Sequence, residues 1–285
     1  MAVTTPRRPG AILDATIRRP RSRDAHATDS PGLAAVVALA RRMSSLAAGP
    51  RARARALTAA REVGVVTLAA LIYTAVRALT QGDLAEAKEN GRRILHVEQA
   101  LHVDWESTLQ SAVLAHSLVS TLANWTYIWG FWPVLAGTAV FLYGRHREEY
   151  FRLRNAVFLS GLIGFAFFAL LPVAPPRLVD PRLIDTITDK TGWYRSVLPA
   201  GITNEYAAMP SLHVGWSLLV GVTVAHAIGR RAYALAVVVP AAMSFAVVAT
   251  ANHYVADVLV GGVVALTALL IASRGPWLRP HVARD

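Results

Sequence analysis

The residues best suited to chemistry include a histidine and an aspartate near the end of the chain. His253 and Asp257 are four positions apart in the segment TANHYVADVLVGG, so a helix would present both on one face. A carboxylate bonded to one imidazole nitrogen sets the tautomer and leaves the other nitrogen available as a nucleophile or base. An aspartate in an apolar segment needs a partner, which His253 supplies. We predict that they act as a pair; a purely structural hydrogen bond is the alternative.

A second histidine, His213, follows Ser211 in the segment NEYAAMPSLHVGWS. Ser211 is a suitable N-cap for a helix, which would place His213 in the first helical turn. The free N–H groups of a first turn bind anions readily. The pattern therefore predicts a histidine beside a phosphate site, with a hydrogen-bonded interfacial histidine as the alternative.

A third cluster is the proline-rich segment LLPVAPPRLVD at 170–180, which contains Arg177. Three prolines break a helix and predict a rigid, extended turn. The planar guanidinium of Arg177 suits a bidentate hold on a phosphate, although an arginine that simply reaches the lipid headgroups is the alternative. If the three clusters lie together, they form a site with an anion clamp, an acid and a nucleophile, as phosphoryl transfer requires.

The elements that must bring these clusters together are membrane helices. The chain of 285 residues is 54% hydrophobic and 16% charged, and several uncharged stretches are long enough to cross a bilayer. We predict an all-α, polytopic membrane protein with a six-helix bundle. The six predicted spans are 63–80, 118–143, 156–173, 213–228, 232–251 and 254–273.

Charge sets the predicted orientation. Residues 1–61 hold twelve arginines against three aspartates, and the loops after the second and fourth spans and the C-terminal tail are also basic. These four segments fall on one side when six spans alternate, so the positive-inside rule places both termini in the cytoplasm. The loops 81–116 and 174–212 and the turn near 252 then face outward from the cell (plasma) membrane. All three clusters lie on that outer face.

The predicted organisation has three parts. Residues 1–61 form a basic, largely disordered cytoplasmic tail with a possible surface helix at 32–47. Residues 62–273 form the six-helix membrane catalytic domain, and 274–285 form a cytoplasmic tail. We expect the basic tail to contact anionic lipid headgroups rather than nucleic acid.

Two further features bear on the site. In the segment 81–116, apolar residues recur at near-helical spacing among charges, which predicts one or two amphipathic helices on the outer leaflet. The recurring residues are Ile94, Val97, Leu101, Trp105 and Leu109. The absence of cysteine excludes disulfides, thiolate metal sites and cysteine nucleophiles.

The motifs PVAPPR, PSLH and NHYVAD, in this order, resemble those of the type-2 phosphatidic acid phosphatase superfamily. The likeness is closest to its inositol phosphorylceramide synthase-like branch and to related actinobacterial membrane proteins, and it covers roughly residues 90–270. The resemblance implies a six-helix core and a two-step mechanism that needs no metal and no cofactor. Its expected partner is a phosphorylated lipid substrate.

The resemblance also implies a role for each residue that matches a motif. His253 would attack phosphorus to form a phosphohistidine, and Asp257 would orient His253. His213 would protonate the leaving alcohol. Arg177, with backbone donors near Ser211, would hold the phosphate oxygens.

The chain departs from the superfamily pattern in its phosphate clamp. Leu212 replaces the glycine common before the first motif histidine, and Val247 stands where many members carry an arginine. A lysine upstream in the first motif is also missing, so the clamp has fewer cations than in the broad family. We name Asn252 as a further phosphate-binding residue. The other candidates for compensation are Tyr254, Arg182 and Arg195.

The motifs leave three functions open. The first is a phosphatase that hydrolyses a phosphomonoester or pyrophosphate on a lipid, and the second is a phosphotransferase that passes the phosphoryl headgroup to an alcohol. The third is a non-enzymatic lipid transporter in which His253 and Asp257 relay protons. By ligand type, His213, His253 and Asp257 could also bind a metal, but the resemblance favours none. Lipid identity and oligomeric state have no signature in the motifs.

Overall fold

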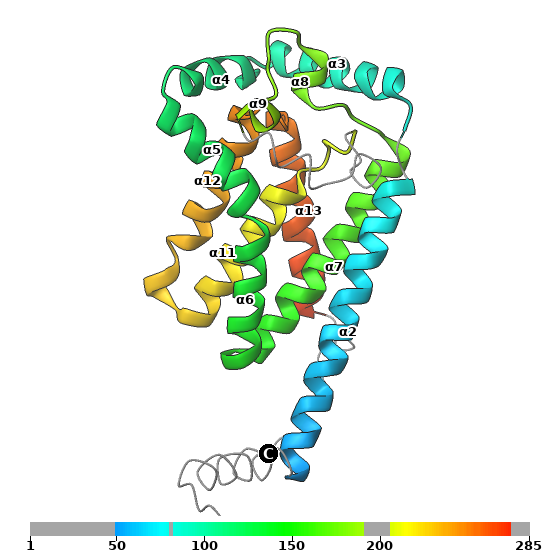
Figure 1. The fold of residues 1–285 in the computed structure, drawn as a ribbon, viewed down its shortest axis with the longest axis vertical. Coiled ribbons are helices and arrows are strands. Elements are labelled where there is room, and N and C mark those ends of the chain that lie inside the picture. Colours follow the sequence, from blue (N-terminus) through cyan, green and yellow to red (C-terminus); the bar gives the residue numbers. More distant parts are fainter. Residues whose placement is uncertain (1–48, 80–81, 191–205, 275–285) are drawn as a thin grey trace, which may run out of the picture. The chain divides into compact units, whose positions relative to one another are not determined.

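The computed structural model describes residues 49–79, 82–190 and 206–274 of the chain. The possible surface helix at 32–47, Arg195, the C-terminal tail and most of the basic tail lie outside these residues. The chain divides into two units, 1–62 and 63–285, and the bundle belongs to the second. Within the described residues the second unit is helical apart from turns and one isolated bridge between Val173 and Ala207 (Figure 1).

The described residues form a succession of helices. They are α2 (Pro50–Leu79), α3 (Leu84–Ala100), α4 (Glu106–Leu114), α5 (Ser117–Trp129), α6 (Trp132–Arg145), α7 (Arg147–Leu170), α8 (Pro176–Val179), α9 (Thr186–Lys190), α11 (Leu212–Ile228), the 3-10 helix η1 (Arg230–Ala232), α12 (Leu235–Ala249) and α13 (Val255–Arg274). The prediction of an all-α chain is thus confirmed for the described residues.

Several of these helices are long and apolar enough to cross a membrane. Four qualify singly, and a fifth span results if α5 and α6 are taken together. The fourth predicted span corresponds to α11, which is apolar but has only 17 residues. The long apolar helices indicate a membrane protein, whereas a count of six spans is not confirmed. The orientation of the termini stays a prediction.

The second predicted span, 118–143, is not one straight helix. It is broken between α5 and α6, whose axes differ by 49°. Pro133 lies in the first turn of α6. Because proline has no N–H and its ring clashes with the carbonyl four residues earlier, it cannot continue α5 past Trp129. The sequence contained this signal, and the predicted span 118–143 corresponds to a pair of helices that can cross the membrane together as one broken span. The first helix also starts earlier than predicted, at Pro50.

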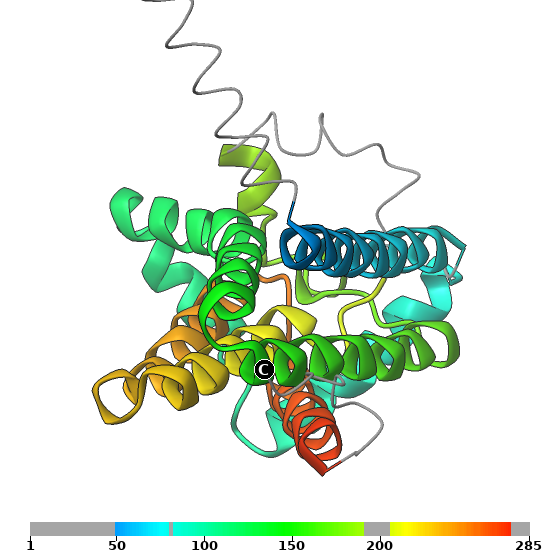
Figure 2. The ribbon, with the colours of Figure 1, turned by 90° about the horizontal axis from the view of Figure 1, so that it is seen from below.

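The centre of the bundle is α11. It packs against α6, α7, α12 and α13, as the view along the bundle shows (Figure 2). The core side chains Leu219, Met243 and Val247 are almost fully buried. Val247, where the superfamily pattern has an arginine, is therefore a core residue.

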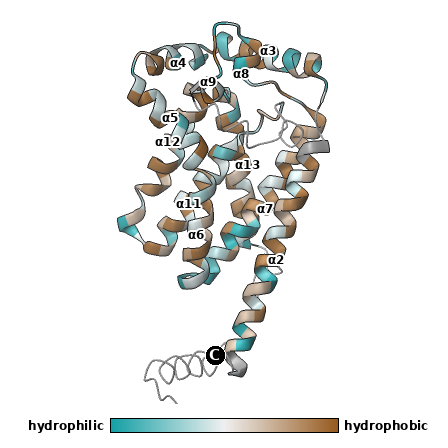
Figure 3. Ribbon diagram, in the orientation of Figure 1, coloured by the Kyte–Doolittle hydropathy of each residue, from teal (hydrophilic) through white to brown (hydrophobic). Residues whose placement is uncertain are grey.

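The outer surfaces of the bundle helices are apolar (Figure 3). Val140, Leu162, Val237 and Leu259 each expose more than 60% of their surface. Large exposed apolar side chains along several helices suit contact with lipid rather than water.

One end of the bundle is covered by α3, α4, α8 and α9 (Figure 1). The prediction of helices within 81–116 is confirmed. Their apolar residues Val97, Leu101 and Trp105 are exposed, whereas Glu98 and Glu106 are buried. The buried face of these two helices therefore carries acids.

Two helices of the bundle approach each other through glycines. A Cβ on Gly261 of α13 would collide with the carbonyl oxygen of Ser211, and one on Gly215 of α11 would lie 2.8 Å from the carbonyl oxygen of Gly261. Side chains at these positions would separate α11 from α13, so the two glycines set how closely the helix starts can meet.

We predict that Gly261→Ala destabilises the protein while Gly262→Ala does not. The added methyl group at 261 must displace backbone, and overpacking of this kind costs about 1–3 kcal/mol. Nothing lies within 4 Å of a Cβ at the neighbouring Gly262. The check is the midpoint of thermal unfolding in detergent. Equal midpoints for the two variants would show that the α11–α13 contact imposes no such constraint.

Candidate active site

The three sequence clusters meet at the covered end of the bundle. The backbone N–H of Ser211, just before α11, donates to the carbonyl oxygen of Asp257 in the first turn of α13 at 3.0 Å. The segment after α7 joins them, because Val173 donates its N–H to Tyr206 and accepts one from Ala208. The predicted convergence is therefore present in the structure.

His253 is buried and has two acceptors beside the same ring nitrogen. Its Nδ1 lies 2.8 Å from the carbonyl oxygen of Ala208 and 3.3 Å from Oδ2 of Asp257. A carbonyl oxygen can only accept a hydrogen bond, so Nδ1 must carry the proton. In the neutral imidazole the other nitrogen, Nε2, then has a lone pair, which is the state that a nucleophile or a base needs.

Asp257 is fully buried and supports this arrangement in a way that differs from the prediction. The two residues do not share a helical face, because α13 begins at Val255, after His253. Instead, Oδ2 of Asp257 accepts the backbone N–H of Tyr254 at 2.9 Å, like the acid of a capping box. The bend before α13 thus places the ring of His253 next to Asp257. Of the two acceptors at Nδ1 of His253, the carbonyl oxygen of Ala208 is the nearer.

His213 lies in the first turn of α11, as predicted, with its ring facing the same site. The ring centroids of His213 and His253 are 6.1 Å apart, close enough for one phosphoryl group to contact both rings. The ring of His213 stacks on Tyr127 at 4.7 Å and lies 4.3 Å from Phe131. These aromatic contacts fix the plane of the imidazole.

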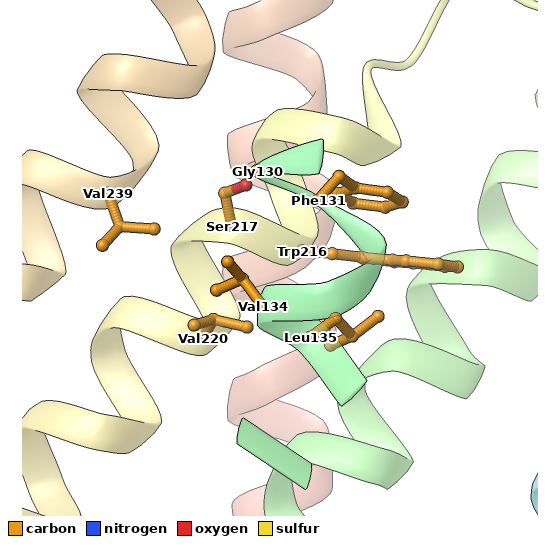
Figure 4. Close-up of a pocket in the computed structure, with 8 residues that line it drawn as sticks. All are labelled: Gly130, Phe131, Val134, Leu135, Trp216, Ser217, Val220 and Val239. Carbon is orange, nitrogen blue, oxygen red and sulfur yellow. The ribbon is translucent and has the colours of Figure 1, made fainter. Parts of the chain in front are cut away.

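Apolar side chains pack next to His213 on the side that faces the bundle interior. Phe131 and Trp216 stack at 5.6 Å, and both line a narrow crevice with residues of α6, α11 and α12 (Figure 4). The indole N–H of Trp216 donates to Ser160 at 3.0 Å, so the ring is held in place. This layer restricts water on the inner side of His213.

Arg177 is held beside His253 by three contacts. Its backbone N–H donates to the carbonyl of Ala251, and its Nη1 donates to Oδ1 of Asn252 at 2.6 Å. Its Nε lies 3.4 Å from Oδ2 of Asp185, and only 8% of the side chain is exposed. The predicted extended segment is present up to Pro175, but Arg177 itself lies in a single helical turn, α8. This turn starts at Pro176 because proline suits a first helical position.

The structure shows the protein partners of the other two predicted phosphate ligands, whose binding of phosphate stays a prediction. Asn252 uses its oxygen for Arg177 and its nitrogen for the carbonyl and hydroxyl of Thr250, so it positions the guanidinium. Ser211 occupies the N-cap position but makes no side-chain capping bond. Its hydroxyl is fully buried and has no hydrogen-bond partner among the described residues. The prediction of a capping hydroxyl was wrong, since Ser211 is instead anchored through its backbone N–H.

Two further candidates for the clamp, Arg182 and Tyr254, are engaged elsewhere. Arg182 binds Asp180 at 2.7 Å with its side chain mostly exposed, and these hydrogen bonds hold the pKa of Asp180 below its usual range. The hydroxyl of Tyr254 donates to the carbonyl of Ala174. Among the described residues, no group of three or more His, Cys, Asp or Glu side chains is arranged to hold a metal ion.

Sequence reasoning missed two contributions to the site. The carbonyl of Ala208 has no side-chain signature, so no sequence signal could have identified it. Tyr127 and Phe131 were visible as an aromatic-rich stretch, but their contact with His213 joins residues more than 80 positions apart.

Comparison with known families gives one match. The family model described as the PAP2 superfamily matches residues 92–271, which is more than half of the chain and includes every described site residue. Comparison with curated proteins and with solved structures finds no match. The match is to the superfamily, and the inositol phosphorylceramide synthase-like branch stays a prediction.

We predict that Arg177→Lys weakens the binding of a phosphate analogue. An ammonium cannot reproduce a bidentate guanidinium, so the affinity for orthovanadate should fall by about tenfold or more. Binding can be followed through the intrinsic tryptophan fluorescence of the detergent-purified protein. The matched control is Arg182→Lys, which alters an exposed arginine already bound to Asp180. If both variants bind vanadate like the wild type, Arg177 is an anchor of α8 and no ligand of the anion.

Proposed function

The chain belongs to the PAP2 superfamily, whose members are phosphatases or phosphotransferases, and on this premise we propose that it is a lipid phosphate phosphatase. The substrate would be a phosphomonoester or pyrophosphate on a lipid, and the reaction would pass through a phosphohistidine on His253. The observation that carries the proposal is the tautomer of His253. Because Nδ1–H faces the carbonyl of Ala208 and Asp257, Nε2 is ready to attack phosphorus.

In the first step, Nε2 of His253 forms a bond to phosphorus while the bond to the leaving alcohol oxygen breaks. His213, in its protonated form, gives a proton to that oxygen, so the lipid leaves as a neutral alcohol. Positive charge grows on the imidazole of His253, and the oxygens of Ala208 and Asp257 stabilise the Nδ1–H that shares it. Arg177 holds the equatorial phosphate oxygens.

In the second step, a water attacks the phosphohistidine. The now neutral His213 accepts a proton from this water, the phosphorus–nitrogen bond breaks and its electron pair returns to Nε2 of His253. The products are inorganic phosphate and the enzyme in its starting state. Both steps use only side chains of this chain, so we propose that the reaction needs no metal ion.

The position of the site supports the proposal of a lipid substrate. The two histidines are at the starts of α11 and α13, at one end of a bundle whose outer surface is apolar. The acyl or prenyl tail of a substrate can stay in the bilayer while its phosphate group reaches the site. A phosphotransferase would share the first step and differ only in the acceptor, which would be an alcohol in place of water.

We predict that His253→Ala abolishes turnover, since no phosphoenzyme can form. The assay is phosphate release by detergent-purified protein from a panel of lipid monophosphates and pyrophosphates, with EDTA present. The wild type should also carry label from a phosphorus-labelled substrate in a form that survives alkali and is lost in acid, as a phosphoramidate is.

Each result of this assay has a distinct meaning. Loss of activity on adding EDTA would refute a metal-independent reaction. A labelled enzyme that releases no phosphate until a lipid alcohol or polyol is added would identify a phosphotransferase. A folded protein without label or release on any lipid of the panel would contradict the proposal.

We predict that the cost of His213→Ala depends on the leaving group. Removal of a general acid should lower turnover of lipid phosphates by roughly 10²–10⁴-fold. With p-nitrophenyl phosphate the first step should suffer far less, because nitrophenolate leaves without a proton. Burst kinetics of nitrophenolate release measure that step alone. An equal loss on both substrates would assign His213 a structural role.

A further inference from the structure

Two buried acids behind the site are used by none of the steps above. Glu98, near the end of α3, and Glu106, at the start of α4, are each only 2% exposed. Oε1 of Glu98 accepts the backbone N–H of Ala256 at 2.7 Å, and Oε1 of Glu106 accepts that of Val255 at 3.0 Å. The two acids therefore satisfy the first N–H groups of α13, which have no partner inside the helix.

Each acid has a second carboxyl oxygen that this contact does not use. Oε2 of Glu98 and Oε2 of Glu106 are both buried, and neither accepts a hydrogen bond from a donor in the described part of the chain. The two carboxyl groups lie close together, because their Oε1 atoms accept the N–H groups of consecutive residues, Val255 and Ala256. Two adjacent buried carboxylates repel each other and cannot donate hydrogen bonds, so their proximity favours a proton on one of the two groups.

The surroundings favour retention of that proton. Burial raises the pKa of Glu98 to about 8, and burial also raises the pKa of Glu106. The charged groups that act on them are each other, Asp104 on the connection from α3 to α4, and Asp257 on α13, all of which are acids. The nearby phenol of Tyr254 is neutral, and the nearby His253 is already bonded to Asp257.

We propose that Glu98 and Glu106 form a carboxylic acid–carboxylate pair that shares one proton and positions His253 and Asp257 by fixing the start of α13. The geometry supports this because the pair binds the N–H groups of Val255 and Ala256, and the preceding N–H, that of Tyr254, binds Asp257. The first turn of α13 is thus fixed both by the glutamate pair and by the His253–Asp257 contact.

Loss of the shared proton would place two like charges against each other in a buried site. The repulsion would move α3 or α4 away from α13 and release the turn that carries His253 and Asp257. Since the folded protein holds this proton more tightly than an unfolded chain does, stability falls as pH rises from the ordinary glutamate range through about 8. The effect on turnover, but not the pair itself, rests on the proposed function.

The test uses single glutamine substitutions. An amide donates to the partner carboxylate as the protonated acid does, but it has no proton to lose in this pH range. We expect Glu98→Gln and Glu106→Gln to keep at least about a third of the wild-type turnover at neutral pH. In the wild type, kcat should fall at alkaline pH while KM stays constant, and both glutamine variants should lack this fall. Glu98→Ala should lose turnover at every pH. The matched control is Glu89→Gln, which alters an exposed acid of α3 paired with Arg92 and should keep the wild-type profile.

A second arm does not depend on activity. Infrared spectra of the detergent-purified protein should show the C=O stretch of a protonated carboxylic acid that disappears as pH rises through about 8. The band should be absent in both glutamine variants and present in Asp257→Asn, which excludes Asp257 as its source. A wild type without the band at neutral pH, glutamine variants that keep the alkaline decline, or glutamine variants that do not fold would overturn the proposal. If the band behaves as expected but no lipid phosphate is turned over, the pair stands and the proposed function fails.

Discussion

The site depends on the close approach of α11 and α13. The backbone N–H of Ser211 reaches the carbonyl of Asp257 only because Gly261 has no side chain where α13 faces Ser211. This contact joins backbone to backbone, so it leaves little freedom for the two helix starts to shift. His213 and His253 are carried by those starts, and their 6.1 Å separation follows from it.

Main-chain groups account for much of the positioning around this contact. The carbonyl of Ala208 selects the tautomer of His253, and the carbonyl of Ala251 accepts the N–H of Arg177. Backbone oxygens are fixed by the fold and do not titrate, so they remain hydrogen-bond acceptors for His253 and Arg177 whatever the pH. Side chains such as Asn252 then only need to complete the orientation of the guanidinium.

The covered end of the bundle concentrates acids in apolar surroundings. Unpaired buried carboxylates are costly, and those of Glu98, Glu106 and Asp257 offset the cost by accepting N–H groups at the start of α13. The same three contacts satisfy donors that an uncapped helix would leave buried and unbonded. The stability of α13 and the geometry of His253 therefore share one set of hydrogen bonds.

The sequence by itself determined the helical, membrane-embedded character of the chain and the residues of the candidate site. Long uncharged stretches predict apolar helices from local composition, and the order of the motifs predicts that His213, His253 and Asp257 meet. The break before α6 could also be predicted, because Pro133 interrupts the helix in the turn just before it. Only the tertiary structure decided which partner Nδ1 of His253 prefers, that the hydroxyl of Ser211 caps nothing, and that the acids of α3 and α4 face inward. These features depend on contacts between residues far apart in the chain, which local sequence patterns do not predict. Some of the contacts are made by backbone atoms, which are the same in every residue type.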